Sequence, residues 1–200
     1  MQLSFLERKE RIVLTTIDVM NECGMHNVST REIAKREGIT EAAIFKHFPK
    51  KYNLYLAVLE YFSKYDNTIS ESIETKNLNP IDAIIFYVDM YSTYYENYPA
   101  ITVILHSFDE LRYNKQLGLK VNVILDARFN FFKQYIIKAQ EIGDISKKYD
   151  ADILTNIFIG TIKSINFDWR RINYNFSLKE KSLLAINILI EGFKENKMEE

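Results

Sequence analysis

The sequence predicts an all-α protein of about nine helices, on the strength of two observations. Glycine and proline are both scarce, with 6 and 3 residues in 200, so few residues are present that interrupt helices or begin turns. Apolar residues also recur at steps of three and four along much of the chain, which is the spacing of one face of an α-helix. Helices joined by short connections are therefore expected, in one or two small domains with a sizeable core.

Composition indicates a cytoplasmic protein. The hydrophobic fraction of 47% and the charged fraction of 26% are ordinary for a soluble globular protein. No run of about eighteen apolar residues is present, and the charged start of the chain lacks the apolar core of a signal peptide. The single cysteine, Cys23, excludes a framework of intramolecular disulfides and fits a reducing compartment. No membrane partner is therefore expected.

Three helices are expected before residue 50. The first covers residues 7–23, where one apolar face recurs. The second begins at Ser29, because Ser29 and Glu32 have the S-x-x-E spacing of a capping box, and Gly38 is suited to end it. Thr40 can cap a third, short helix. Two short helices joined by a tight turn that contains glycine form a helix-turn-helix unit, whose second helix lies in the major groove of DNA.

Six more helices are expected in the rest of the chain. Pro49 suits the start of the first of them, because proline is tolerated where a helix begins. Ser177 and Glu180 repeat the capping-box spacing at the start of the last. The expected ranges, in order, are 50–73, 80–98, 100–112, 115–142, 150–172 and 177–196.

The stretch from Val28 to Leu54 resembles the DNA-binding domain of the TetR (tetracycline repressor) family of bacterial regulators. The family pattern is a capping Ser or Thr, an acidic residue, Ile-Ala, a Gly-Val/Ile-Ser/Thr turn, and two aromatic residues before a Lys and a Leu. The matching residues here are Val28, Ser29, Glu32, Ile33, Ala34, Gly38, Ile39, Thr40, Phe45, Phe48, Lys51 and Leu54. The sequence departs from the pattern at Phe45, where the family usually has a tyrosine whose hydroxyl contacts a phosphate.

The resemblance implies a helix-turn-helix DNA-binding domain in residues 1–51 and a helical domain for ligand binding and dimerisation in residues 52–200. Such a protein is a transcriptional regulator, usually a repressor, that leaves its operator when a small molecule binds. Residues 26–51 hold six Lys or Arg against three acidic residues, although the net charge of the chain is −1. The residues expected to contact double-stranded operator DNA are Ser29, Thr30, Arg31, Thr40, Glu41, Ala42, Ala43, Phe45, Lys46, His47 and Lys51.

The middle of the second domain is rich in aromatic residues, and polar residues interrupt its apolar runs. A cavity lined by rings with a few polar groups is suited to a small molecule, and the resemblance favours that interpretation. We expect an apolar or aromatic effector between the helices at 80–98 and 115–142. The candidate pocket residues are Phe86, Tyr87, Met90, Tyr91, Tyr94, His106, Phe108, Asn122, Arg128, Phe129, Phe132 and Asn166.

The last two helices are expected to join two subunits of a homodimer in a four-helix bundle. The final helix has apolar residues on more than one face, which is more than the body of one subunit requires. Two DNA half-sites also require two motifs held at a fixed distance. The candidate interface residues are Ile153, Ile157, Leu183, Ile186, Ile190 and Phe193.

Two other function classes are considered. The first is a DNA-binding protein that has no inducer and acts through a protein partner. This alternative is retained because residues 40–51 are similar to TetR relatives that tether a division inhibitor to chromosomal DNA. A sealed interior would favour it. An enzyme has little support, since no G-x-S-x-G, Walker A, Cys-x-x-Cys or His-Glu-x-x-His motif occurs. His26 and His47 have no His or Cys at metal-ligand spacing, so no metal and no cofactor are expected.

Overall fold

The computed structural model describes residues 7–195, and every regular element within them is a helix. Contacts divide the chain into two compact units. The first contains the residues up to Tyr65 together with Ala100–Ile124, and the second contains Asp66–Pro99 and the residues from Leu125 onward. No helix among the described residues is both long enough and apolar enough to span a bilayer.

Five α-helices and one 3-10 turn lie wholly in the first unit: α1 (Arg8–Cys23), η2 (Met25–Asn27), α2 (Thr30–Glu37), α3 (Glu41–His47), α4 (Lys51–Phe62) and α7 (Val103–Leu111). Three lie wholly in the second: α6 (Pro80–Asn97), α9 (Ala151–Arg171) and α10 (Leu178–Gly192). The remaining elements contribute residues to both units: α5 (Lys64–Thr75), η3 (Pro99–Thr102) and α8 (Lys115–Glu141).

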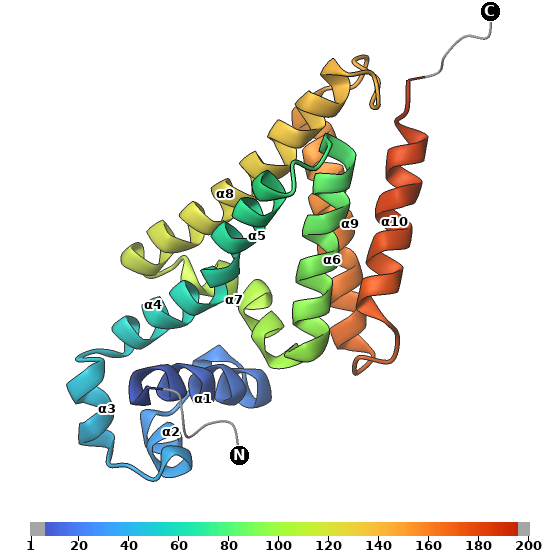
Figure 1. The fold of residues 1–200 in the computed structure, drawn as a ribbon. Coiled ribbons are helices and arrows are strands. Elements are labelled where there is room, and N and C mark those ends of the chain that lie inside the picture. The colour runs from blue at the N-terminus through green and yellow to red at the C-terminus, as the bar shows by residue number, and fades with distance from the viewer. Residues whose placement is uncertain (1–6, 196–200) are drawn as a thin grey trace, which may run out of the picture. The chain divides into compact units, whose positions relative to one another are not determined.

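The first unit is built on α1, which packs against both α2 and α4 (Figure 1). The buried face of α1 includes Ile12, Ile17 and Met20, none of which is exposed. Their recurrence at helical spacing is the pattern from which the sequence predicts this helix. The hydroxyl of Tyr55 on α4 donates a hydrogen bond to the carbonyl oxygen of Met25 at 3.1 Å, so α4 also holds the turn between α1 and α2.

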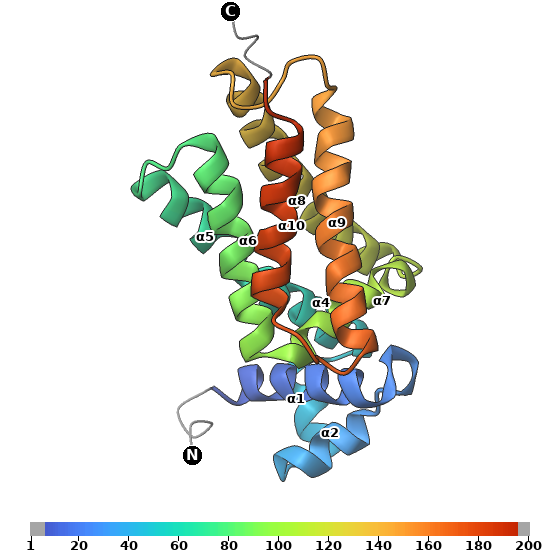
Figure 2. The same ribbon diagram turned by 90° about the vertical axis from the view of Figure 1, so that its right-hand side faces the viewer.

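The second unit places α10 between α6 and α9, and the three helices lie side by side in Figure 2. The hydroxyl of Ser177 caps α10 by accepting the backbone amide of Glu180 at 3.1 Å, which confirms the predicted start of this helix. The same hydroxyl donates to the carboxylate of Glu96 at 2.9 Å, so the cap also joins α10 to α6. Side-chain caps of this kind stabilise a helix by about 1 kcal/mol.

The helix predicted at 50–73 is two helices, α4 and α5, separated at Ser63. Ser63 has ψ near 1°, and its hydroxyl donates to the carbonyl oxygens of Leu59 at 3.1 Å and Glu60 at 3.3 Å. Serine hydroxyls that bond to carbonyls of the preceding turn compete with the helix ladder and bend it. This break accounts for ten α-helices in residues 7–195 where about nine were predicted.

Only one of the two hydrogen bonds of the capping box predicted at Ser29 forms. The hydroxyl of Ser29 accepts the amide of Glu32 at a long 3.4 Å, as predicted. The carboxylate of Glu32, however, accepts from Nε of Arg36 at 2.9 Å, one turn further along α2. In the pair with Arg36 both partners are charged, whereas the backbone amide of Ser29 is neutral, so Glu32 gains more from the arginine.

Candidate nucleic-acid interface

The turn between α2 and α3 is fixed by local hydrogen bonds. Gly38 ends α2 in the left-handed conformation, with φ 63° and ψ 34°, and the amide of Ile39 donates to the carbonyl oxygen of Ala34 at 3.0 Å. This is the geometry in which glycine is favoured after a helix. The hydroxyl of Thr40 then accepts the amide of Ala43 at 3.2 Å and starts α3. The turn therefore has the helix-turn-helix form expected from the sequence.

Both helices of this motif bury a narrow face and leave the rest at the surface. Ile33 and Ala34 of α2 and Ile44 of α3 are buried. The eleven residues expected to contact DNA are all partly or fully exposed, and the ring of Phe45 is 41% exposed. Thr30 and Ala43 are the half-buried members of that set. The hydroxyl of Thr30 donates to the carboxylate of Glu41, which links α2 to the start of α3.

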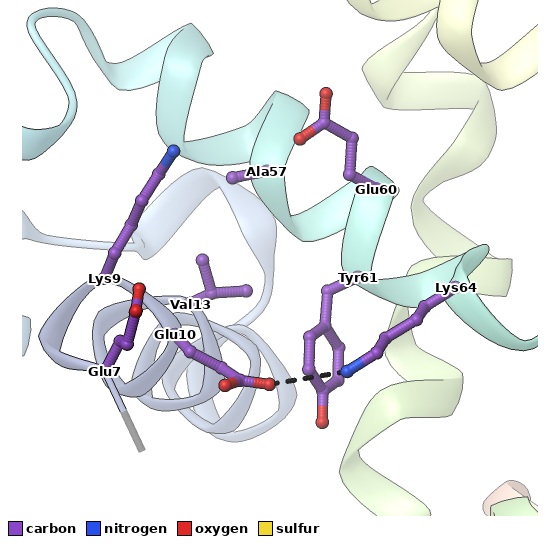
Figure 3. A pocket seen from close by; sticks show the side chains of 8 residues that line it. All are labelled: Glu7, Lys9, Glu10, Val13, Ala57, Glu60, Tyr61 and Lys64. Carbon is purple, nitrogen blue, oxygen red and sulfur yellow. Dashed lines mark ion pairs between the residues drawn. The ribbon is translucent and has the colours of Figure 1, made fainter.

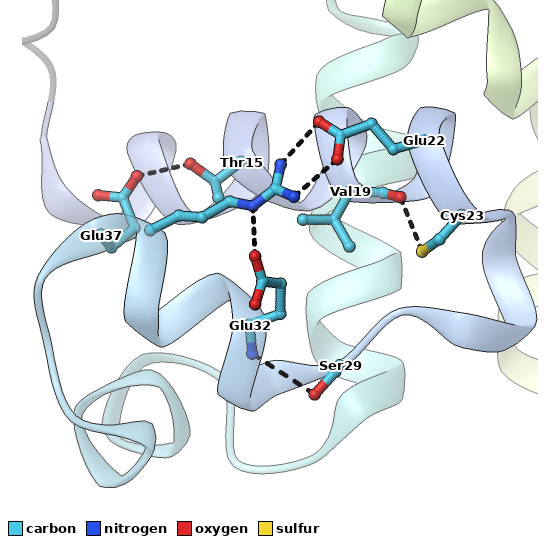
Figure 4. A network of polar contacts seen from close by, with 8 residues as sticks. Thr15, Val19, Glu22, Cys23, Ser29, Glu32 and Glu37 are labelled. Carbon is cyan, nitrogen blue, oxygen red and sulfur yellow. Dashed lines mark hydrogen bonds and ion pairs between the residues drawn. The ribbon is translucent and has the colours of Figure 1, made fainter.

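The basic residues of the motif have two different environments. Arg36 makes hydrogen bonds with Glu22 of α1 at 2.6 and 2.7 Å and with Glu32, so its charge is engaged within the unit (Figure 4). These bonds lower the pKa of the Glu22 carboxyl and raise the pKa of Arg36. Arg31 and Lys46 form no ion pair within residues 7–195 and remain available to an anionic partner.

A second cross-link holds α2 to α1 and involves a carboxylate that the sequence reasoning did not single out. The side chain of Glu37 is only 10% exposed. It accepts from the guanidinium of Arg11 at 2.9 and 3.0 Å. It also accepts from the hydroxyl of Thr15 at 2.5 Å (Figure 4). Sequence spacing within one helix carries no signal for such pairs, because the partners come from two helices. Together with Arg36 they fix the orientation of α2 on α1.

The first unit also has an open groove of about 350 Å³ between α1 and α4 (Figure 3). Its wall mixes charges of both signs, and Glu10 and Lys64 pair across it at 3.7 Å. The lining residues are Glu7, Lys9, Glu10, Val13, Ala57, Glu60, Tyr61 and Lys64. Its open shape, with three acidic and two basic side chains, does not favour one ligand class.

The predicted pocket residues are distributed over both units. His106, Phe108 and Asn122 belong to the first, where His106 and Asn122 are exposed and Phe108 packs edge-on against Phe62 at 5.7 Å. The other nine belong to the second unit, in which Met90 is 41% exposed and the remaining eight are buried or half-buried. His106 and Asn122 thus face solvent, because the apolar residues around them already form the buried faces of α7 and α8.

Aromatic side chains pack against one another between α6 and α8 in the second unit. The ring of Tyr87 stacks on Phe131 at 4.3 Å and contacts Tyr91 and Phe132 at 4.7 and 5.2 Å. Phe131 was not among the candidate pocket residues, although it lies in the same apolar run as Phe132. Beside these rings lies a cavity of about 60 Å³, lined by Asp66, Asn67, Ser70, Tyr87, Ala127, Arg128 and Phe131.

Arg128 and Asp66 form an ion pair in the wall of this cavity. Asp66 accepts from the guanidinium at 3.0 and 3.3 Å, and both side chains are only 15% exposed. The guanidinium also donates to the hydroxyls of Tyr91 at 3.2 Å and Tyr95 at 3.4 Å. Burial opposes the charged form of Arg128, but Tyr95, Tyr87 and Asp66 favour it, and together they raise the pKa of Arg128. Asp66 was missed by the sequence reasoning because a single acid in an amphipathic helix normally faces solvent.

The predicted dimer residues divide between surface and core. Ile153 and Ile157 of α9 are 60% and 36% exposed, as a free interface requires. Ile186 and Ile190 of α10 are instead buried within the subunit, so the structure corrects their assignment to a surface. Residues four apart share a helix face, and the exposed face of α10 is the one that carries Leu184 and Ile188. Leu183 and Phe193 are half-buried.

Comparison with known proteins gives two family matches that together span most of the chain. Residues 12–58 match the model of bacterial regulatory proteins of the tetR family, and residues 60–192 match that of the C-terminal region of YsiA-like proteins. Among curated proteins, the fatty acid metabolism regulator protein of Bacillus subtilis is 20% identical over 91% of this chain and 93% of its own length. The nucleoid occlusion factor SlmA of Vibrio cholerae is 21% identical over 79% of this chain and 81% of its own.

Solved structures share the fold at low sequence identity. FadR from Bacillus subtilis in complex with stearoyl-CoA has a TM-score of 0.79 and 20% identity, and covers 92% of this chain and 98% of its own. The MbdR regulator from Azoarcus sp. CIB has a TM-score of 0.81 and 20% identity over 93% of this chain and 98% of its own.

Proposed function

The chain belongs to the TetR family of bacterial regulatory proteins and is a DNA-binding transcriptional regulator; from that premise we propose that it represses an operator and releases it when a small molecule binds the second unit. The observation that best supports this proposal is the exposed face of the capped pair α2 and α3. It combines two braced helices with basic side chains that form no ion pairs within the described chain.

In this proposal the two helices have different tasks. Base edges are contacted from α3 and its cap, by Thr40, Glu41, Ala42, Ala43 and Lys46, because the second helix of the motif enters the major groove. Phosphates are held by the residues around them: Ser29, Thr30, Arg31, His47 and Lys51. Phosphate contacts position the protein on the duplex, whereas base contacts specify the sequence.

The two tasks are separable by mutation. Lys51→Ala should weaken binding to all duplexes about equally and reduce the slope of log affinity against log salt by about one unit. Ala43→Trp should abolish the preference for the selected operator while the far-ultraviolet spectrum stays helical. Lys147→Ala, an exposed lysine between α8 and α9, is the matched control and should leave both properties unchanged. Equal affinity of the wild-type protein for selected and random DNA at physiological salt would contradict the proposal.

The proposed dimer uses the exposed apolar face of α9 and α10. Ile153 and Leu184 are 60% and 63% exposed, and Phe167 and Ile188 are 56% and 62% exposed. Large apolar side chains gathered on two neighbouring helices are typical of an interaction surface. Obligate dimers bury more than about 2,000 Å² in total.

The proposed effector is an apolar or aromatic molecule that enters between α6 and α8. The relatives named above include a fatty acid regulator and a structure with bound stearoyl-CoA, so acyl thioesters are the first class to test. The cavity is much smaller than the 300 Å³ or more of common ligand pockets, so binding must displace part of the ring cluster. Such a ligand favours a second conformation, and a coupling of roughly 1–3 kcal/mol reduces operator affinity several-fold to about a hundredfold.

A thermal-shift screen of acyl-CoA esters, fatty acids and aromatic drugs, followed by operator release with each hit, tests the effector proposal. Hits should both raise the melting temperature and displace operator DNA. Hits that stabilise the protein without displacing DNA would refute the inducer role.

A second candidate is a DNA-binding protein that acts through a protein partner. The observation in its favour is the small volume of the cavity between α6 and α8, about 60 Å³, together with the match to SlmA. It predicts that the protein binds its DNA site without responding to any compound in the screen. Release of DNA by one small molecule at a stoichiometric concentration would rule it out.

A further inference from the structure

Three segments of the described chain connect the two compact units. Within residues 7–195 the chain crosses from one unit to the other after Tyr65, after Pro99 and after Ile124. The first crossing lies inside α5 and the third inside α8, so each is made by a continuous helix, and the second lies in η3. These three segments are therefore the covalent route by which a change in the second unit reaches the first.

One polar cluster of the second unit has a member close to each crossing. Its members are Asp66, Tyr91, Tyr95 and Arg128, and we refer to them as the Arg128 cluster. Asp66 is the first residue after the first crossing. Tyr95 lies about one helical turn before the second crossing, and Arg128 lies about one turn after the third. A single guanidinium on α8 thus bonds to α5 and to α6 near the points where all three segments leave the unit.

The ion pair of the cluster is held by several contacts at once. Asp66 accepts from the guanidinium at 3.0 and 3.3 Å, and the hydroxyls of Tyr91 and Tyr95 accept from it at 3.2 and 3.4 Å. The guanidinium also lies over the ring of Tyr91, 4.7 Å from its centre. Because both charged side chains are only 15% exposed, separating them would leave two poorly hydrated charges, so the paired arrangement is strongly favoured.

The first crossing also follows a break in the helix. The chain bends at Ser63, between α4 and α5, just before Tyr65 and Asp66. The helix ladder is already interrupted at such a point, so the chain can change direction there more easily than within an intact helix. Asp66 is fixed to Arg128 directly after this point, and the ion pair therefore limits how far the start of α5 can turn.

We propose that the Arg128 cluster fixes the directions in which the three segments leave the second unit, and that its opening is the step by which a change in this unit reaches the DNA-reading helices. The inference rests on the proposed function and adds to it, because it assigns the transmission of the effector signal to four named side chains. Asp66 and Arg128 act in it as positioning residues. With the cluster closed, the two motifs of a dimer keep one separation and match one spacing of half-sites.

Hydrogen exchange of the full-length protein, measured by mass spectrometry of its peptides, tests the holding role without DNA or effector. Asp66→Asn keeps the shape of the side chain, removes its charge and leaves the guanidinium without its counter-ion. Amides at the three crossings, in residues 62–70, 94–103 and 121–129, should then exchange at least about tenfold faster than in the wild type. Amides of α3 and α10 should keep their rates.

Asp89→Asn is the matched control, because it removes the same charge from another ion pair of the second unit, the one with Lys179 at 2.6 Å. It should leave exchange at the crossings unchanged. Acceleration spread evenly over the second unit, α10 included, would overturn the proposal, and so would unchanged exchange at the crossings of Asp66→Asn. If Asp66→Asn does not fold, the double variant Tyr91→Phe/Tyr95→Phe takes its place and should show the same local pattern, because it removes two hydroxyl acceptors and keeps the ion pair.

Operator spacing tests the regulatory part of the proposal. The wild type should bind the selected operator more tightly than duplexes whose half-sites are moved apart by one or two base pairs. Asp66→Asn should reduce this preference by about fivefold or more, the lower end of couplings between distinct sites, because its two motifs adjust independently. Asp89→Asn should keep the preference of the wild type.

The outcomes separate this inference from the function on which it rests. An Asp66→Asn variant with faster exchange at the crossings and an unchanged spacing preference would overturn the regulatory role of the cluster. A wild-type protein that prefers no operator would instead contradict the proposed function, and hydrogen exchange would still decide whether the cluster holds the three crossings.

Discussion

Phe45 is an exposed aromatic residue on α3 at the position where TetR proteins usually have a tyrosine. Its ring is 41% exposed, so a hydroxyl added at its edge can reach a phosphate without disturbing the core. Phe45→Tyr should raise operator affinity by about two- to tenfold, the range that corresponds to one hydrogen bond of about 0.5–1.5 kcal/mol. Fluorescence anisotropy with the selected operator measures this change.

Phe48 provides the control for that substitution. Its ring is only 3% exposed, so Phe48→Tyr introduces a buried hydroxyl and should lower the melting temperature instead of improving binding. If Phe45→Tyr leaves affinity unchanged, the ring of residue 45 does not approach the DNA backbone.

Tyr55 makes the stability of the first unit sensitive to alkaline pH. Burial, with a smaller effect from Glu110, raises the pKa of Tyr55 from 10.0 to about 12. A group whose pKa is raised on folding contributes its full stabilisation below pH 10, and that contribution is lost as the pH rises to about 12. The hydrogen bond to Met25 is lost over the same window.

Tyr55→Phe should therefore reduce the loss of stability between pH 10 and 12 that the wild type shows. Burial also raises the pKa of Tyr87 and Tyr95, so part of the alkaline loss will remain. Urea unfolding at a series of pH values gives the slope of the unfolding free energy against pH for the wild type and for Tyr55→Phe. Tyr113→Phe, at a residue that is 93% exposed, should follow the wild type. Parallel slopes for Tyr55→Phe and wild type would contradict the assignment.

At the residue scale, local patterns predicted more of the DNA-binding surface than of the cavity. Gly38 and Thr40 act through neighbours within a few residues, so the motif that contains them is readable from sequence. Glu37 and Asp66 act through partners on other helices, and spacing along one helix cannot reveal those partners. The DNA contacts themselves stay predictions.

Among the elements, the helix predicted at residues 50–73 differs most from its prediction, because it is broken into α4 and α5. The apolar stripe continues through Ser63, so periodicity alone predicts one helix, and only the hydroxyl bonds to Leu59 and Glu60 reveal the interruption. Ser63→Ala removes those bonds and should stabilise the protein by about 0.5 kcal/mol, the difference in helix propensity.

Thermal unfolding of Ser63→Ala and Ser63→Gly tests this interpretation. Alanine should raise the melting temperature and glycine should lower it, because glycine is the poorer helix former by about 1 kcal/mol relative to alanine. A lower melting temperature for Ser63→Ala would mean that the two hydroxyl bonds stabilise the native chain more than they bend it.

At the scale of the whole molecule, the central prediction is the dimer. Ile188→Lys places a charge on the exposed face of α10 and should convert the proposed dimer to a monomer without unfolding it. Charged residues are depleted from the cores of interfaces because their desolvation is costly. Light scattering at micromolar concentration measures the outcome.

Leu119→Lys is the matched control for that substitution. Leu119 on α8 is 62% exposed, as is Ile188, but it lies outside α9 and α10. Its replacement should leave the molecular mass unchanged. A dimer that survives Ile188→Lys, or that dissociates with Leu119→Lys, would move the interface away from the proposed face.

The helical fold was predictable because apolar residues recur at helical spacing and several helices begin at a side-chain cap, such as those at Ser29, Thr40 and Ser177. The division of the chain into two units was not predictable from the sequence. The first unit takes in α7 and the start of α8, which follow α6 in sequence, and only tertiary contacts reveal this. The domain boundary expected at residues 51 and 52 stays a prediction. The family models meet between residues 58 and 60.

The exposed apolar face of α9 and α10 has a genetic consequence if it pairs subunits as proposed. A subunit with a defective α3 keeps that face intact and therefore still assembles with normal subunits. In a cell that expresses both forms, most dimers then contain at least one subunit whose α3 cannot bind its DNA half-site. Damage to α3 should be dominant over the normal gene copy, whereas loss of the α10 face should be recessive, because such subunits never enter a dimer.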